Sequence, residues 1–231
     1  MKILISILSE EREYWYKELE QGIRDTWGSE KNDSDEIVDI IYFYANPDLP
    51  QDFVTEGDKL WVKHQENYFS TSGKNVMMLE HVLENYDFDY LFRTNLSSYI
   101  NLKKLIEYAK DKPKDDFYCG ITGQPHDCPH KFVSGSGHFL SRNLVSLIVS
   151  NKSEINYNTV DDLELGKFLD SKGIQPTEGL RWQGKPEESI SVLSENTNLI
   201  DLSHYHFRLW SENKDDYIKK MHLIHRLKNA R

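Results

Sequence analysis

A chain of 231 residues can bury one large hydrophobic core, because a compact chain of this length buries roughly 70% or more of its unfolded surface. Its 28 Lys and Arg residues against 38 Asp and Glu residues give a net charge of −10, which excludes general nucleic-acid binding, since that needs a basic surface. The first twelve residues turn charged too early for a secretory signal or a membrane span. We therefore expect a cytoplasmic protein of bacterial or viral origin, or a chain trimmed of an N-terminal anchor.

The N-terminal part of the chain alternates between strand and helix patterns. Ile3–Leu8 is a continuous apolar run, which is typical of a strand covered on both faces. A helix is predicted over residues 11–27, with Gly28 as its stop, and a second buried strand over residues 37–44. The serines of residues 70–72 are candidate caps for the next helix, whose apolar positions recur at helical spacing.

The same alternation continues to the C-terminus. We predict strands over residues 90–93 and 117–121, helices over residues 102–109, 161–172 and 213–228, a helix capped at Ser141 after segment 132–140, and an apolar-aromatic segment over residues 202–210. Strands that alternate with helices indicate an α/β fold, and no linker or repeat divides residues 1–231, so one domain is predicted.

Ligands of open α/β sheets bind outside the carboxyl ends of the strands. The residues that follow predicted strands are therefore the candidates for a site. They are Ser9 and Glu10, residues 93–98, the Ser-Gly-Ser-Gly of residues 134–137, and the pair Asp161-Asp162.

Four of these segments carry a family resemblance. Residues 22–28 (GIRDTWG) resemble the A-I-R-x-T-W-G of the β-1,3-glycosyltransferase superfamily, which includes the Fringe proteins. Residues 90–101 resemble its K-x-D-D-D strand, residues 134–141 (SGSGHFLS) its C-S-G-G-G-Y-V-L-S, and residues 161–166 (DDLELG) its E-D-V-x-x-G. Lys74 matches a lysine on the family's preceding helix.

The resemblance implies a GT-A fold, a Rossmann-like mixed sheet flanked by helices. It implies an inverting hexosyltransferase that moves a sugar from a nucleotide sugar, UDP-linked, to a glycan hydroxyl, with Asp162 as the general base. From the residues alone, Asp161 and Asp162 also fit the start of a helix, where a carboxylate caps free N–H groups; Asp161 is expected to be the cap. No nucleic-acid partner and no membrane span are expected.

The sequence departs from the family at its metal site. The family's three aspartates, which hold Mn²⁺, align with Asn95, Leu96 and Ser97. A hard cation prefers anionic oxygen ligands, so no metal cofactor is expected. Asn95 and Ser97 are expected to hydrogen-bond the donor, and Arg93 to approach a phosphate.

Basic residues can neutralise a leaving diphosphate in place of a metal. The candidates for donor binding are Arg24, Lys74, Arg93, Arg208, Lys219 and Lys220. For the C-terminal lysines, the alternative interpretation is a solvated basic helix face.

The glycine-rich segment is the candidate donor or acceptor loop. Gly135 and Gly137 either let the backbone approach a sugar or form a tight turn, and Ser134, Ser136 and His138 accompany them. His138 replaces the family's tyrosine, which leaves acceptor contact there open.

Several other residues are given structural interpretations. Trp27 is expected in the core. His204 and His206 are expected on one face of a strand, where one of them matches the family's C-terminal histidine. Cys119 and Cys128 are interpreted as free thiols, with a disulfide across the loop between them as the alternative. The spacing of His126, Cys128 and His130 is not a recognised zinc set.

Two other functional classes compete with sugar transfer. The replaced aspartates also fit a catalytically silent GT-A domain that binds a glycan or a partner protein. A nucleotidyltransferase-like enzyme is the weaker rival, because the basic glycine-rich loop expected after its first strand is missing.

Overall fold

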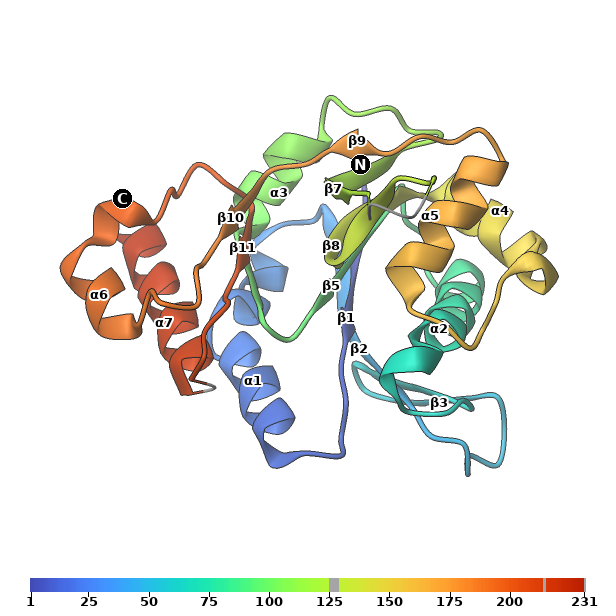
Figure 1. Ribbon diagram of the computed structural model, residues 1–231, viewed down its shortest axis with the longest axis horizontal. Helices are drawn as coiled ribbons and strands as arrows, with labels where there is room; N and C mark the ends of the chain where they lie inside the picture. The colour runs from blue at the N-terminus through green and yellow to red at the C-terminus, as the bar shows by residue number, and fades with distance from the viewer. Residues whose placement is uncertain (125–128, 214, 231) are drawn as a thin grey trace.

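The computed structural model describes residues 1–124, 129–213 and 215–230. Its centre is an eight-stranded mixed sheet (Figure 1). The strands of this sheet are β1 (Ile3–Leu8), β2 (Ile37–Ala45), β3 (Phe53–Glu56), β4 (Lys59–Val62), β5 (Tyr90–Asn95), β7 (Tyr118–Gly123), β8 (Phe132–Ser141) and β9 (Thr177–Glu178). Their order is β3-β4-β2-β1-β5-β8-β7-β9, in which β4, β2, β1 and β5 run parallel and β8 is antiparallel to both of its neighbours.

A second, small sheet extends from the carboxyl end of β5. It consists of β6 (Ser98–Ile100), β11 (His206–Arg208) and β10 (Arg181–Gln183), with β11 in the middle. Because β11 pairs with β6, the C-terminal third of the chain is brought back beside the end of β5.

Seven α-helices in the described part of the chain accompany the two sheets. They are α1 (Tyr14–Arg24), α2 (Thr71–Asn85), α3 (Leu102–Ala109), α4 (Arg142–Ser150), α5 (Asp161–Ser171), α6 (Ile190–Glu195) and α7 (Asp215–Asn229). Short 3-10 helices occur at η1 (Trp27–Asp33), η2 (Tyr68–Ser70), η3 (Lys152–Glu154) and η4 (Thr197–Leu199). None of the helices in the described part of the chain is long and apolar enough to cross a membrane.

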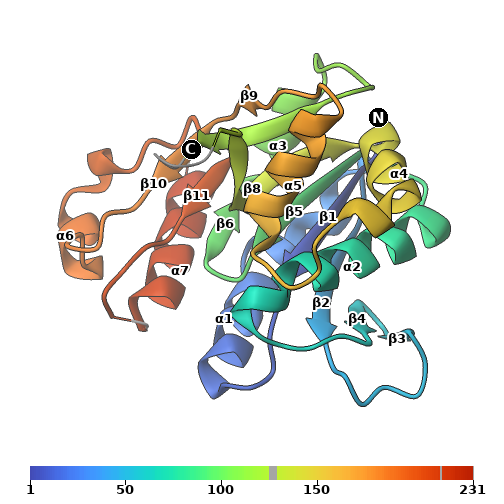
Figure 2. The same cartoon turned by 45° about the vertical axis from the view of Figure 1, so that its right-hand side comes forward.

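The central sheet separates two hydrophobic cores. Side chains of a strand alternate between faces, so Ile3, Ile5 and Ile7 of β1 enter one core and Leu4 enters the other. The first core contains side chains of α1, α3, α6 and α7, and the second those of α2, α4 and α5. Figure 2 shows these two groups of helices on opposite sides of the sheet. The predicted α/β sheet with helices on both faces is confirmed.

The first predicted helix is too long. It ends at Arg24, and Gly28 lies within η1 instead of stopping an α-helix. Trp27 begins η1 and is fully buried, as expected, with its indole N–H donating to the carbonyl of Ser98 at 3.2 Å.

Other departures concern short strands and caps. The β3–β4 hairpin was not predicted; it turns at Gly57, whose φ of 60° favours glycine. Ser141 holds the N-cap position of α4, but its hydroxyl donates to Asn143 Oδ1 at 2.6 Å instead of capping the helix. His204 and His206 do not share a strand face, because β11 begins only at His206.

The glycine-rich segment forms part of strand β8, so a tight turn is wrong for it. Gly137 pairs with Thr94 of β5. A Cβ atom at Gly137 would lie 2.4 Å from the ring of His206, so the missing side chain gives room to a buried imidazole. This glycine therefore serves packing between the two sheets.

Gly166 serves a similar purpose between α5 and β8. A Cβ atom there would lie 2.7 Å from the carbonyl oxygen of Lys131 and 2.6 Å from the Cβ of Phe132. Both neighbours belong to the segment that begins β8, so α5 would have to move away to relieve these clashes. This packing holds the start of α5 against β8.

We predict that Gly166→Ala lowers the free energy of unfolding by about 1–3 kcal/mol, because it overpacks this contact. The matched control is Gly22→Ala in α1, where the new Cβ would meet Ile218 and Met221 at an ordinary 3.5 Å. There the better helix propensity of alanine, about 0.8–1 kcal/mol, should leave stability unchanged or raised. Urea unfolding of both variants measures the difference. Equal effects of the two substitutions would contradict the close packing of α5 on β8.

Candidate functional site

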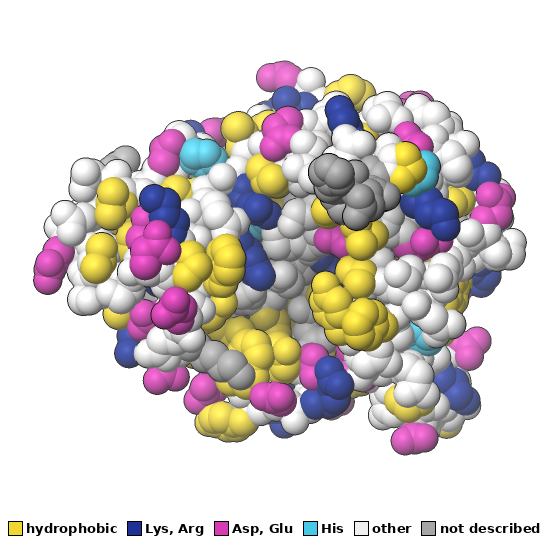
Figure 3. All heavy atoms as spheres, in the orientation of Figure 1, with side chains coloured by type: hydrophobic (Ala, Val, Ile, Leu, Met, Phe, Trp, Pro, Cys, Tyr) yellow, Lys and Arg dark blue, Asp and Glu magenta, His cyan; other side chains and the backbone are white. Residues whose placement is uncertain are grey.

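A cleft lies at the carboxyl ends of β1 and β5, where the resemblance and the topology both place a ligand. It consists of two hollows that share Leu8, Tyr68, Thr71, Asn95, Arg208 and Tyr217. The first, the Asp162 hollow, has a volume of about 460 Å³ and is also lined by Arg93, residues 134–136, residues 160–162, Arg181, Gln183 and Trp210. The second, the Trp15 hollow, has about 420 Å³ and is also lined by residues 9–10, Arg12, Trp15, Tyr16, Leu19, residues 66–67, Lys74 and residues 96–97. Figure 3 shows the cleft as a depression in the surface, with basic side chains inside it and hydrophobic side chains on both of its sides.

Asp162 stands in the first turn of α5 and faces the glycine-rich strand. Its Oδ2 accepts a hydrogen bond from the backbone N–H of Gly135 at 3.0 Å, and Oδ1 accepts from the N–H of Leu163 at 2.9 Å. Burial raises the pKa of Asp162 above its ordinary value, and the neighbouring charge of Asp161 adds to the rise. A carboxylate whose ionised form is disfavoured in this way is a stronger base than an exposed one.

Asp161 is not the helix cap that the sequence suggested. The N-cap position is Val160, and the Asp161 carboxylate accepts a hydrogen bond from Arg93 Nη2. In this ion pair the side chain of Asp161 is only 7% exposed and that of Arg93 only 2%. Arg93 reaches the cleft, as predicted, but its charge is neutralised by Asp161.

Two other guanidinium groups in the cleft are held by neutral partners. Arg208 Nη1 donates to Asn95 Oδ1 at 3.0 Å and to the Ser97 carbonyl at 3.4 Å. Arg181 Nη1 donates to the hydroxyl of Ser136 at 2.6 Å and to that of Ser134 at 3.2 Å. Within the described ranges of the chain, neither arginine forms an ion pair with a carboxylate. Burial and the charge of Arg208 lower the pKa of Arg181 to about 10, so it remains a cation at neutral pH.

Arg181 is one of the site residues that the sequence did not indicate. It lies on β10, a strand of three residues with no recognisable motif, and reaches the cleft because β10 pairs with β11.

The residues at the family's metal position do not fit a divalent cation. The one side-chain carbonyl oxygen there, Asn95 Oδ1, accepts from Arg208 and from the hydroxyls of Ser97 and Ser98 at 3.2 and 3.1 Å. A guanidinium beside that oxygen would repel Mn²⁺. His206 is buried and lies 3.0 Å from Ser98 Oγ through its Nε2, so its ring is engaged within the protein.

Other candidate metal ligands do not change this result. No group of three His, Cys, Asp or Glu side chains suited to a metal occurs among the residues that the structure describes. His126 and Cys128 lie outside the described residues. The predictions about a pairing of Cys128 with Cys119 and about a zinc set therefore concern residues that the structure does not describe. His130 contacts Asp170.

Of the other predicted donor residues, only Lys74 lines the cleft. Its Nζ is buried beneath the Trp15 hollow and donates to the Ser9 carbonyl and to Glu66 Oε2, both at 2.7 Å. Lys74 therefore joins α2 to the end of β1.

Three predicted donor residues lie elsewhere. Arg24 is paired with Asp58 and Glu20 beside a separate hollow of about 200 Å³. Lys219 is exposed on α7 and lines another hollow with three acidic residues, Glu18, Asp25 and Asp215. Lys220 is fully buried and donates to the backbone carbonyl of Trp210 at 2.7 Å.

Only the first part of the glycine-rich segment lines the cleft. Ser134, Gly135 and Ser136 line the Asp162 hollow, whereas Gly137 and His138 do not. His138 is 1% exposed, and neither ring nitrogen has a hydrogen-bond partner among the described residues. Burial lowers the pKa of His138 to about 3, so the ring is neutral.

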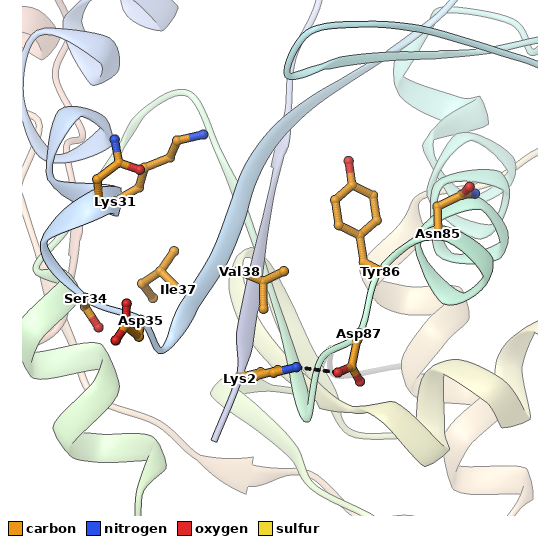
Figure 4. A pocket seen from close by; sticks show the side chains of 10 residues that line it. Lys2, Lys31, Ser34, Asp35, Ile37, Val38, Asn85, Tyr86 and Asp87 are labelled. Atoms are coloured by element: carbon orange, nitrogen blue, oxygen red, sulfur yellow. Dashed lines mark hydrogen bonds and ion pairs between the residues drawn. The ribbon is translucent and has the colours of Figure 1, made fainter.

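A further hollow of about 450 Å³ opens at the opposite, amino-terminal ends of β1 and β2 (Figure 4). It is lined by exposed polar groups such as Lys2 and Asp87, which form an ion pair with each other. Its size is close to that of the Asp162 hollow, but the residues that line it include no carboxylate with a raised pKa and no guanidinium. The cleft at the carboxyl ends is the better candidate.

The solved structures to which this chain is similar include glycosyltransferases. The crystal structure of a glycosyltransferase involved in the glycosylation of the major capsid of PBCV-1 superposes with a TM-score of 0.55 at 10% sequence identity, covering 95% of this chain and 99% of that chain. Two others superpose less well. The apo-form glycosyltransferase GlyE of Streptococcus pneumoniae TIGR4 superposes with a TM-score of 0.45 at 8% sequence identity, covering 100% of this chain and 64% of that chain. Mouse xyloside xylosyltransferase 1 superposes with a TM-score of 0.43 at 10% sequence identity, covering 90% of this chain and 96% of that chain.

These comparisons establish the fold. Only the first superposition is close enough to argue from, and with the eight-stranded sheet it identifies a GT-A type architecture, as predicted. No protein-family model and no curated protein sequence matches the chain. The finer resemblance to the Fringe-like superfamily stays a prediction.

The raised pKa of Asp162 has a consequence for stability. A carboxylate with a pKa above its unfolded value costs folding free energy when ionised, and this cost disappears below the unfolded pKa of about 3.9. Asn in place of Asp removes the cost and keeps an oxygen for the Gly135 amide. We therefore expect Asp162→Asn to unfold at a higher temperature than the wild type at about pH 8, with a smaller difference at about pH 4.5. Thermal unfolding at both pH values tests this. A less stable variant at about pH 8 would mean that the arginines of the cleft stabilise the ionised carboxylate on balance.

Proposed function

We propose that the protein is an inverting glycosyltransferase that moves a sugar from a nucleotide sugar, UDP-linked, to the hydroxyl of a glycan without a divalent metal. The observation that carries this proposal is the set of charges in one cleft. Among the residues that the structure describes, the carboxylate of Asp162 has no cationic partner, and the guanidiniums of Arg181 and Arg208 have no anionic one. Sugar transfer needs a base for the acceptor hydroxyl and positive charge for the leaving diphosphate.

The two hollows suit the two parts of such a donor. The Trp15 hollow supplies aromatic and apolar walls, with Trp15 and Tyr16 stacked at 3.8 Å between ring centroids, which suits a nucleoside. Arg208 borders both hollows, so a diphosphate beside it would direct the sugar toward Asp162. Lys74, Asn95 and Ser97 are the remaining donor contacts in this proposal.

The proposed reaction is a single displacement. Asp162 removes the proton of the acceptor hydroxyl as its oxygen attacks the anomeric carbon from the face opposite the nucleotide. The bond from that carbon to the diphosphate oxygen breaks, its electron pair stays on the diphosphate, and Arg208 and Arg181 stabilise the added negative charge. The products are the inverted glycoside and a nucleoside diphosphate.

The same groups support the proposal of metal independence. Asn95 and Ser97 offer no anionic ligand, and Arg208 already supplies positive charge at that position. This supports diphosphate binding by arginine instead of Mn²⁺.

The first test is thermal unfolding with UDP, GDP, CDP and dTDP, each with Mn²⁺ and with EDTA. A ligand at 100 times its dissociation constant stabilises by about 2.7 kcal/mol, which should raise the midpoint by roughly 5–10 °C. We expect a shift with UDP that persists in EDTA. A shift that needs Mn²⁺ would contradict metal independence, and no shift with any nucleotide would favour a silent GT-A domain that binds a glycan or a partner protein.

The second test removes the charge of Arg208. Loss of charge-assisted hydrogen bonds worth about 1.5–3 kcal/mol predicts that Arg208→Gln weakens UDP binding by roughly 10–150-fold. Lys219→Gln is the matched control, because it removes the same charge from an exposed position outside the cleft. Calorimetric titration of both variants measures the effect. Equal losses would show that net charge, and not contact with Arg208, governs binding.

The third test concerns the base. Asp162→Asn should lower kcat by about 10²–10⁴-fold while UDP binding is retained. In the wild type, kcat/KM should fall at low pH with a midpoint above the ordinary carboxyl range, because the pKa of Asp162 is raised. Full activity of the variant would exclude Asp162 as the base.

A further inference from the structure

Exposed aromatic side chains gather at the mouth of the cleft. Four aromatic side chains are exposed in the described part of the chain, namely Tyr14, Tyr68, Phe69 and Trp210. Trp210 lines the Asp162 hollow and is 51% exposed; Tyr68 borders both hollows and is 66% exposed. Phe69 packs edge-on against Tyr68 with ring centroids 5.3 Å apart. Large apolar groups left exposed around a polar cleft are typical of a ligand-binding surface.

The backbone that carries Trp210 is fixed although its ring is exposed. The N–H of Trp210 donates to the carbonyl of Arg208 at 3.1 Å, and that of the preceding Leu209 donates to the Ser97 carbonyl at 2.9 Å. Its carbonyl accepts from the buried Lys220 at 2.7 Å. Lys220 is thus a positioning residue for the segment that presents Trp210. A ring held by a fixed backbone loses little conformational freedom when a ligand packs on it.

The hollow between the aromatic side chains offers both apolar and polar surface. Asp162, Ser134 and Gln183 line the same hollow as Trp210. This combination matches a pyranose, whose ring presents a C–H face that packs on an aromatic ring while its hydroxyl groups need hydrogen-bond partners.

We propose that Trp210 and Tyr68 form the acceptor subsite and hold a pyranose ring of a glycan, with its reacting hydroxyl directed at Asp162. This inference rests on the proposed function and specifies the acceptor class. Trp210 contacts only the hollow that contains the base, whereas a nucleoside would occupy the Trp15 hollow. The ring of Trp210 is therefore assigned to the acceptor, and Tyr68 closes the subsite from the α2 side.

The test observes donor and acceptor binding separately. Saturation-transfer NMR is recorded on the full chain with UDP and with a panel of methyl pyranosides of glucose, galactose, mannose, xylose and N-acetylglucosamine. We expect at least one glycoside to receive saturation, strongest on the protons of one ring face. Trp210→Ala should weaken its binding at least tenfold and leave the UDP signals unchanged, and Trp210→Phe should restore part of the binding.

Tyr14→Ala is the matched control, since Tyr14 is an exposed aromatic residue that lines neither hollow, and the variant should bind glycosides as the wild type does. Unchanged glycoside binding by Trp210→Ala, or no glycoside binding by the wild type, would overturn the acceptor subsite. If the wild type gave no saturation-transfer signals with UDP, that result would instead overturn the donor class of the proposed function. The UDP signals of Trp210→Ala also verify that the variant is folded.

Discussion

The buried ion pair between Arg93 and Asp161 is the constraint on which the cleft depends. It joins the centre of the main sheet, through β5, to the first turn of α5. Removing one partner of such a pair costs about 3–5 kcal/mol because it leaves the other charge buried and unpaired. The pair fixes the start of α5, and so places the next residue, Asp162, against the amide of Gly135. By neutralising Arg93, it also decides which charges in the cleft stay unpaired.

Those unpaired charges are separated within one cleft. Asp162 carries negative charge on the α5 side, and Arg181 and Arg208 carry positive charge on the side of the small sheet. The chain as a whole has a net charge of −10. Two guanidiniums without carboxylate partners among the described residues therefore make the charge of this cleft locally opposite to that of the chain. Each is hydrogen-bonded to neutral oxygens, which orient it without cancelling its charge. An anionic ligand is the partner that such an arrangement favours.

Part of the lining of this cleft was predicted from the sequence, and part was not. Asp162, Arg93 and Asn95 follow predicted elements and do line the cleft, because the ends of parallel strands must meet at one edge of a sheet. Arg24 matched a family motif, yet it is engaged by Asp58, thirty-four residues further along the chain. Arg181 was not predicted to line the cleft, because a strand of three residues is too short to show the alternating pattern by which strands are recognised in a sequence.

By itself, the sequence determined the alternation of strands and helices, the two-sided burial of the sheet and the candidates at its carboxyl edge. These depend on hydrophobic periodicity, which is local along the chain. Only the tertiary structure decided which charged groups are neutralised and which remain free. Lys219 and Lys220 are adjacent, but one is exposed and the other is buried beneath Trp210. Charge pairing depends on distances in space between distant segments, and the order of residues does not contain those distances.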